Sequence, residues 1–353
     1  MRALVHGYFG MGNVGDEAIL SVLIDGLRSR GIEPIILSSN PKRSTLLHGV
    51  LSCPNKLLSL GFWKNFLGSS MLIFSGGGRY GKRTMRRMCT LAILAKALRK
   101  RVEFRALGIY PYEWVGLPII ANSPEPFGDL FTRALIKTAF TLADRVSVRD
   151  EFSKHVLASS GVAKEVGLKE DLAFELKPSS RERSLQILSK HGVSVGNRPL
   201  VGVNLRTLHP EVRWKLVDVV SNSLDWLIAR GAEVVFVPFG YGSTPKRFFD
   251  NDLIIAGELK KCMKNRDSFK VIDNEYRPQE ILGIFRFFDL FIGMRFHSIV
   301  FSMIMRVPTV ALIYDTKTVE LLKERRGWCY CIPILINELD ANKLKKAVDA
   351  ITE

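Results

Sequence analysis

The sequence has few cysteines and none of the ligand spacings that a four-coordinate metal site needs. Its 353 residues include five cysteines, scattered and odd in number. This excludes a small disulfide-stapled scaffold and favours a reducing compartment. Cys329 and Cys331 lie on one face of an expected strand, and without a second pair we expect them to be buried rather than bound to zinc.

Long apolar runs are also missing. The longest apolar stretch, residues 298–314, is interrupted by Arg306 and Pro308 and falls short of the roughly 20 residues that a membrane-spanning helix needs. Residues 1–9 run straight into glycines, without the successive basic, apolar and cleavage regions of a signal peptide. We therefore expect a cytoplasmic protein that at most contacts the inner face of a membrane.

Acidic residues are scarce relative to basic ones. Lys and Arg total 51 against 35 Asp and Glu, a net charge of +16, which suits nucleic acid, an anionic membrane or a small polyanionic substrate. Residues 79–105 contain ten basic residues and a single acid, Glu103. Apolar residues recur there at helical spacing, so we expect an amphipathic helix whose basic face either is simply solvated or meets a membrane or an acidic ligand.

What the sequence does contain is a regular alternation of short β-rich runs with helical patterns, which is typical of parallel βαβ units. Hydrophobic residues make up 47% of the chain, which excludes disorder, and the length suggests two domains. The first series of expected strands comprises residues 3–8, 34–37, 71–74, 102–107 and 145–148, and the second comprises 200–205, 233–238, 269–272, 289–292 and 309–313.

A segment rich in Pro, Ser and Gly separates the two series. We therefore predict an N-terminal Rossmann-like domain at 1–177, a linker at 178–198 and a second Rossmann-like domain with a C-terminal helix at 199–353. The predicted fold is α/β, with two doubly wound sheets facing across a cleft. Ligands in such folds bind at the carboxyl ends of the strands.

The first expected strand leads into a glycine-rich loop. Gly10, Gly12 and Gly15 satisfy the dinucleotide-binding pattern. However, the second expected strand ends in two serines rather than a ribose-binding acid, and Asp16 and Glu17 occupy the helix start where a pyrophosphate would sit. The loop is better suited to uncharged hydroxyls, with Asp16 or Glu17 accepting their protons or hydrogen bonds. Capping of the helix by Asp16 is an alternative that is compatible with this interpretation.

The third expected strand ends in three consecutive glycines, Gly76, Gly77 and Gly78. Such a run exposes backbone amides and allows a ligand to approach closely, or it serves a tight turn.

Two arginines follow expected strands in the two domains. Arg149 precedes a helix that Asp150 is expected to cap, and Arg206 takes the equivalent place in the second domain. Together they are suited to clamp an anion. The alternative for Arg149 is an ion pair with Asp150 or Glu151.

The densest group of functional residue types is Gly293-Met294-Arg295-Phe296-His297, with Lys317 beyond the next strand. Gly293 ends a strand, so Arg295 and His297 lie in the following turn, where a helix start favours an anion and a histidine can exchange protons near neutral pH. A lone histidine is often structural, but the neighbouring cations favour a functional site.

Five sequence blocks together resemble the polysaccharide pyruvyl transferase family: Gly-Asn-Val-Gly-Asp-Glu-Ala-Ile-Leu at 12–20, the triple glycine at 76–78, Ser-Val-Arg-Asp at 147–150, Gly-Met-Arg-Phe-His at 293–297 and Tyr-Asp-Thr-Lys at 314–317. The resemblance implies a GT-B-like pair of domains. It also implies a transferase that moves pyruvate from phosphoenolpyruvate onto a sugar as a ketal, in the biosynthesis of cell-wall or other cell-surface polysaccharides.

The resemblance also implies roles for particular residues. His297, Arg149 and Lys317 would be catalytic, with His297 transferring protons, while Arg149, Lys317 and two further arginines grip the phosphate and carboxylate of phosphoenolpyruvate. Asp16 or Glu17 would act as a base. The further substrate-binding residues would be Arg206 and Arg295 for the donor, Gly12, Asn13, Asp16 and Glu17 for the acceptor's hydroxyls, and Gly77 and Gly78 beside them. No cofactor is required, because phosphoenolpyruvate is a co-substrate.

The segment after the triple glycine, Arg79-Tyr80-Gly81-Lys82, departs from the family pattern and leaves the acceptor open. In family members the acceptor is often a polyprenyl-linked sugar, and the helix within 79–105 would then dock on the membrane. The alternative enzyme is a GT-B glycosyltransferase that uses a nucleotide-sugar donor. A nucleic-acid binder is not expected, since no binding motif accompanies the positive charge.

Overall fold

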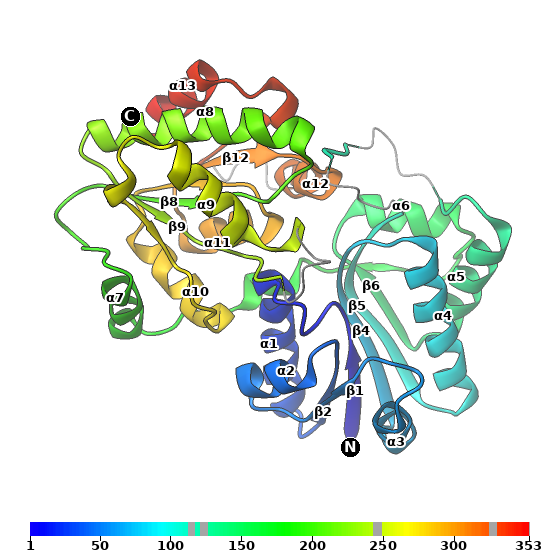
Figure 1. Ribbon diagram of the computed structural model, residues 1–353. Coiled ribbons are helices and arrows are strands. Elements are labelled where there is room, and N and C mark those ends of the chain that lie inside the picture. Colours follow the sequence, from blue (N-terminus) through cyan, green and yellow to red (C-terminus); the bar gives the residue numbers. More distant parts are fainter. Residues whose placement is uncertain (112–116, 121–125, 243–248, 325–329, 353) are drawn as a thin grey trace. The chain divides into compact units, whose positions relative to one another are not determined.

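The computed structural model describes residues 1–111, 117–120, 126–242, 249–324 and 330–352 (Figure 1). The chain divides into two compact units. The first comprises Met1–Met11, Asp16–Trp114 and Ala121–Leu176, and the second comprises Gly12–Gly15, Val115–Ile120 and Lys177–Glu353. Residues 12–15 and 117–120 therefore group with the second unit, although the sequence places them in the first domain.

The first unit is built on a seven-stranded parallel sheet with the order β3-β2-β1-β4-β5-β6-β7. Its strands are β1 (Arg2–His6), β2 (Glu33–Ser38), β3 (Ser52–Pro54), β4 (Met71–Arg79), β5 (Arg101–Tyr110), β6 (Arg145–Val148) and β7 (Gly167–Leu168). The helices between them are α1 (Val14–Arg28), α2 (Pro41–His48), α3 (Leu60–Gly68), α4 (Lys82–Ala97), α5 (Leu130–Leu142) and α6 (Glu151–Ser159), and the 3₁₀ helix η1 (Leu172–Glu175) follows β7.

The second unit is built on a six-stranded parallel sheet with the order β10-β9-β8-β11-β12-β13. Its strands are β8 (Leu200–Asn204), β9 (Glu233–Phe236), β10 (Phe269–Val271), β11 (Leu290–Gly293), β12 (Thr309–Ile313) and β13 (Cys331–Leu335). Its helices are α7 (Arg181–Lys190), α8 (Pro210–Ala229), α9 (Asp252–Cys262), α10 (Pro278–Ile284), α11 (Phe296–Met305), α12 (Thr316–Glu324) and α13 (Ala341–Thr352). The 3₁₀ helices η3 (Arg266–Ser268), η4 (Phe285–Phe287) and η5 (Ile336–Glu338) complete it.

The prediction of two parallel, Rossmann-like sheets is confirmed. Both series of expected strands form, whereas β3 and β7 were missed. These two strands lie at the edges of the first sheet, contain three and two residues, and β3 ends in a proline, so they carry little of the alternating apolar pattern that identifies a strand. Cys331 begins β13 and is partly buried, and Cys329 lies outside the described residues.

Residues 178–198, which we expected to form a linker, contain α7. This helix packs against α10 in the second unit, and its side chains Ser184, Ile187 and Leu188 are buried. The amide of Ser179 also donates to the carbonyl of Gln279 at 2.8 Å. The segment is therefore part of the second unit's packing.

Each sheet reverses its strand order at one place, between β1 and β4 in the first unit and between β8 and β11 in the second. Aromatic rings pack on the strands of the first sheet. In the first unit the ring of Phe104 stacks between those of Phe74 and Phe140, with centroids 5.0 and 4.1 Å apart. Loops at the carboxyl ends of such central strands are where open α/β sheets bind ligands.

Five of the ten basic residues at 79–105 lie near acids. Lys82 and Arg86 lie near Asp129, and Lys96 pairs with Asp144. Further along, Glu103 pairs with the two arginines that flank it in β5. The helix within this segment is therefore less cationic than its sequence indicates. No helix among the described residues is both long and apolar enough to cross a membrane.

Candidate functional site

Arg206 and Arg295 lie at the place where the second sheet reverses its strand order. Arg206 follows β8 and Arg295 follows β11, and these two strands are paired from Leu290↔Val201 to Gly293↔Asn204. Parallel pairing brings both carboxyl ends to one edge of the sheet, so the two arginines lie next to each other. The backbone of Arg206 there contacts Met294, which is 88 residues further along the chain. Both side chains are buried.

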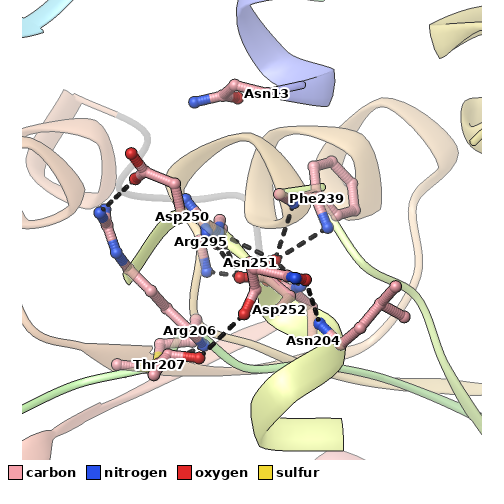
Figure 2. Close-up of polar contacts among 12 residues, drawn as sticks. Asn13, Asn204, Arg206, Thr207, Phe239, Asp250, Asn251, Asp252 and Arg295 are labelled. Carbon is pink, nitrogen blue, oxygen red and sulfur yellow. Dashed lines mark hydrogen bonds and ion pairs between the residues drawn. The ribbon is translucent and has the colours of Figure 1, made fainter. Parts of the chain in front are cut away.

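A buried carboxylate fixes Arg295 (Figure 2). Asp252, fully buried at the start of α9, accepts from Nε of Arg295 at 2.9 Å and from Nη2 at 2.5 Å. The same carboxylate accepts from the amides of Phe239 and Gly240, each at 2.9 Å. Burial by itself lowers the pKa of Arg295, but the charge and hydrogen bonds of Asp252, together with the nearby Tyr314 and Asp250, outweigh burial and raise this pKa. Arg295 is a permanent cation held in one orientation.

Arg206 is held from two sides. Its guanidinium donates to the hydroxyl of Tyr314 at 3.2 Å. It also donates to Asp250 at 2.9 Å (Figure 2). Its amide also donates to the sulfur of Met294, the residue before Arg295. Asp250 and Asp252 therefore belong to one short segment that positions both arginines.

His297 lies in the first turn of α11, where it is buried beneath the glycine-rich loop. A Cβ on Gly15 would stand 1.9 Å from its Nδ1, so only glycine fits there. The ring of Phe296 meets that of His297 edge to face at 4.9 Å. Close packing on both sides limits the imidazole's motion, which suits a group that must exchange protons with one substrate atom.

Gly12 and Asn13 lie in the same unit, beside the segment that contacts Arg295. The amide of Tyr241 donates to the carbonyl of Gly12 at 2.8 Å, and Asn13 forms an isolated antiparallel bridge with Gly240. The side chain of Asn13 accepts from the amide of Gly15 at 3.0 Å and so caps α1. The cap that we considered for Asp16 is provided by Asn13.

Lys317 lies in the first turn of α12. Its Nζ is 3.5 Å from Asp315, a fully buried carboxylate that also accepts from the hydroxyl of Thr318 at 2.9 Å. The ammonium group lies 5.6 Å from the centroid of the Phe296 ring, which itself contacts His297. Lys317 and His297 therefore both lie next to the ring of Phe296.

The triple glycine of the first unit ends β4 and requires glycine at each position. Gly76, Gly77 and Gly78 have φ angles of 81°, 136° and 159°, and a Cβ on Gly77 would stand 2.6 Å from the carbonyl oxygen of Gly108. A Cβ on Gly76 would lie 3.3 Å from a carboxylate oxygen of Asp16. Close packing of β4 on β5 accounts for Gly77, and the carboxylate of Asp16 lies over Gly76.

Arg149 follows β6 in the first unit and is buried among acids. It donates to Asp171 at 3.0 Å and lies 3.3 Å from Asp150, which also accepts from the hydroxyl of Tyr110 at 2.6 Å. Burial lowers the pKa of Arg149, but Tyr110 and the two carboxylates outweigh it and raise that pKa. The ion pair that we considered between Arg149 and Asp150 is present. No sequence pattern identified the second partner, Asp171, which follows the short strand β7.

Glu17 is buried in the first unit and bonds to its own loop. One carboxylate oxygen accepts from the amide of Gly10 at 2.8 Å, and the other lies 2.7 Å from Nε2 of His48. Nδ1 of His48 in turn lies 3.4 Å from the hydroxyl of Ser21. These contacts hold the first half of the glycine-rich loop against α1, and no sequence pattern singled out His48.

The structure therefore brings Gly12, Asn13, Arg206, Arg295, His297 and Lys317 together in the second unit, and it places Asp16, Glu17, Gly77, Gly78 and Arg149 in the first. Among the described residues, no group of three or more His, Cys, Asp or Glu side chains is arranged to hold a metal ion.

These features define a GT-B-like α/β protein with two buried arginines where the second sheet reverses its strand order. Among solved structures, the chain resembles the UDP-GlcNAc 2-epimerase from Methanocaldococcus jannaschii, with 13% identity and a TM-score of 0.61 over 100% of this chain and 92% of that one. It also resembles a glycosyltransferase from Rickettsia africae ESF-5, with 13% identity and a TM-score of 0.58 over 99% of this chain and 87% of that one. A search of curated proteins finds no match.

The family is shown by sequence. The family model for polysaccharide pyruvyl transferase matches residues 13–316, and the chain belongs to that family.

Proposed function

We propose that this protein transfers pyruvate from phosphoenolpyruvate to a sugar as a ketal, with no cofactor, in the biosynthesis of a cell-surface polysaccharide. The observation that carries this proposal is the pair Arg206 and Arg295, two oriented cations at the strand reversal of the second sheet, with His297 and Lys317 nearby. Phosphoenolpyruvate presents a phosphate and a carboxylate, and both need cations when they leave water.

The reaction needs four events. The methylene carbon of phosphoenolpyruvate gains a proton, one sugar hydroxyl attacks the adjacent carbon, phosphate departs from that carbon, and a second hydroxyl of the same sugar closes the ketal. Both hydroxyl protons are released: one balances the proton taken up by the methylene carbon, and the other leaves on the departing phosphate. His297 would transfer protons, while Arg206, Arg295 and Lys317 offset the negative charge of the donor and of departing phosphate.

For the acceptor's hydroxyls, Gly12 and Asn13 beside the Arg295 segment support a role in the second unit. The acceptor-binding residues of the first unit stay predictions: Asp16, Glu17, Gly77 and Gly78, with Asp16 or Glu17 as the base. The role of Arg149 as a further cation for the donor also stays a prediction. A cytoplasmic location and membrane contact by 79–105 also stay predictions. The ion pairs within that segment weaken the membrane interpretation.

The direct test has two stages. Binding of phosphoenolpyruvate is first measured by calorimetry without any acceptor, so that a missing sugar cannot hide the donor site. Phosphate release and a ketal methyl signal are then followed with a panel of free and lipid-linked sugars. If nucleotide sugars bind and phosphoenolpyruvate does not, the protein is instead a glycosyltransferase on the same fold.

Variants sharpen the test. We expect His297→Ala to lower kcat by roughly 10²- to 10⁴-fold with little change in donor affinity, because a proton-transfer group acts mainly in the transition state. Lys317→Gln should weaken phosphoenolpyruvate binding by about tenfold or more. The matched control is His155→Ala, an exposed histidine on α6. Turnover by His297→Ala equal to that of the control would refute the assignment.

A further inference from the structure

One long segment of the first unit carries no acidic residue at all. The sequence has no Asp or Glu between Glu33 and Glu103, whereas it has 13 Lys and Arg residues there. Within this segment, α3 and the turn before it differ from α4, because three of the five basic residues of α4 lie near the acids that flank α5, Asp129 and Asp144. The positive charge around α3 has no acid nearby in the sequence to offset it.

α3 also exposes an apolar face. The helix packs on β1 and β3, and its side chains Phe62 and Phe66 are buried. Leu60, Trp63 and Leu67 repeat at intervals of three and four residues and therefore share a second face of the helix. Leu60 is 89% exposed and Leu67 is 59% exposed. A helix that buries apolar residues on one side normally places polar ones on the other.

The turn before α3 extends this surface and is held firmly. Leu58 is fully exposed, and the indole Nε1 of Trp63 donates to the carbonyl of Leu57 at 2.7 Å. Lys56 and Lys64 are exposed on either side of it. We call the group Lys56, Leu58, Leu60, Trp63, Lys64 and Leu67 the α3 surface. It combines projecting leucines, an indole with its N–H satisfied, and lysines that can reach past them.

We propose that the α3 surface docks on an anionic lipid bilayer. A helix face of leucine and tryptophan among lysines is the composition that lies in a membrane interface, where the apolar side chains enter the acyl boundary and the lysines meet anionic headgroups. A second copy of this chain is the less favourable occupant, because two such surfaces would bring lysines of like charge together. The α3 surface contains none of the residues proposed for the reaction, and the proposal does not depend on the proposed function.

The test is flotation of the whole protein with vesicles of phosphatidylcholine alone and of phosphatidylcholine with about one-quarter phosphatidylglycerol. We expect binding to the anionic vesicles only, weakening as salt is raised. Leu60→Ser with Leu67→Ser should lower the partition coefficient by at least about tenfold. Lys56→Gln with Lys64→Gln should lower it by about tenfold on anionic vesicles.

Matched controls separate this surface from general hydrophobicity and charge. Leu130→Ser removes an exposed leucine from α5, and Lys260→Gln with Lys261→Gln removes two exposed lysines from α9. Both should bind vesicles as the unmodified protein does, and circular dichroism checks that every variant is folded. Absence of vesicle binding, or equal loss in the controls, overturns the proposal. So does a concentration-dependent dimer in ultracentrifugation that the leucine variant abolishes, because a second copy would then occupy the surface.

Discussion

Arg295 is held in one orientation by a carboxylate that the rest of the second unit has fully buried. Asp252 neutralises its charge and also accepts from two backbone amides. In Asp252→Asn the arginine would lose its counter-charge while staying buried. We expect the free energy of unfolding to fall by about 3–5 kcal/mol, measured by urea denaturation.

Asp250→Asn is the matched control for this residue. Asp250 pairs with Arg206, but its side chain is 29% exposed. Water can therefore replace much of the stabilisation that the carboxylate gives to the charge of Arg206. Its loss should cost less than about 1 kcal/mol. An equal loss of stability in the two variants would show that Asp252 has no special role in holding Arg295.

His6, the last residue of β1, gives the stability of the first unit a pH dependence. Burial, with a smaller contribution from the charge of Arg87, lowers the pKa of His6 from 6.5 to about 4. Below pH 6.5 the imidazole of His6 binds a proton in the unfolded chain but not in the folded chain. The free energy of unfolding therefore falls as the pH drops from 6.5 towards 4, and this contribution is fully present above pH 6.5. The loss is at most about 3 kcal/mol at pH 4.

His6→Gln should flatten this part of the profile, as measured by denaturation midpoints between these two pH values. The exposed His155→Gln should leave the profile as it is. A His6→Gln profile as steep as that of the unmodified protein would mean that another group causes the acid sensitivity.

At the scale of an element, the start of α1 is constrained by what lies against it. Gly15→Ala would place a methyl group within 2.6 Å of three atoms of the His297 side chain, so the backbone or the imidazole must shift. We expect a loss of stability of about 1–3 kcal/mol, together with reduced phosphoenolpyruvate-dependent phosphate release. Gly26→Ala, in the same helix, meets nothing within 4 Å and should stabilise the protein by up to about 1 kcal/mol. Similar effects at the two positions would contradict the packing that the structure shows.

The elements themselves could largely be predicted from the sequence, because alternating and helical apolar patterns are local. Arg206 and Arg295 could be predicted for the same reason, since each directly follows a strand. Asp252 could not, because it lies 43 residues from Arg295 along the chain and only the fold brings the two together. Asp171 and His48 were missed for the same reason, lying 22 and 31 residues from the side chains that they contact.

At the scale of the whole molecule, the second unit is not a contiguous piece of sequence. Val14 donates to Phe239 at 3.0 Å and Tyr241 to Gly12 at 2.8 Å, while Ile119 exchanges hydrogen bonds with Tyr314 and Thr316 at 2.8 and 3.1 Å. A fragment starting at Lys177 would lack these partners. We expect it to be less stable than the second unit of the full chain by about 2–4 kcal/mol.

The comparison requires that the two units of the full chain unfold in separate transitions. Hydrogen exchange is then measured at amides of β8 and β11, both in the fragment and in the full chain. Adding a synthetic peptide of residues 9–20 should restore part of the protection near Phe239 and Tyr241. Equal protection in the fragment and the full chain would show that residues 12–15 and 117–120 add nothing to the second unit.

The discontinuity of the second unit also has a consequence for its synthesis. Gly12 and Val14 leave the ribosome long before Phe239 and Tyr241, their hydrogen-bond partners. The first sheet can therefore assemble early, whereas residues 12–15 of the glycine-rich loop form these hydrogen bonds only after most of the second sheet has been translated. Contacts so distant in sequence slow the closing step of folding. Placement of the loop over His297 should consequently be among the last events as this protein matures.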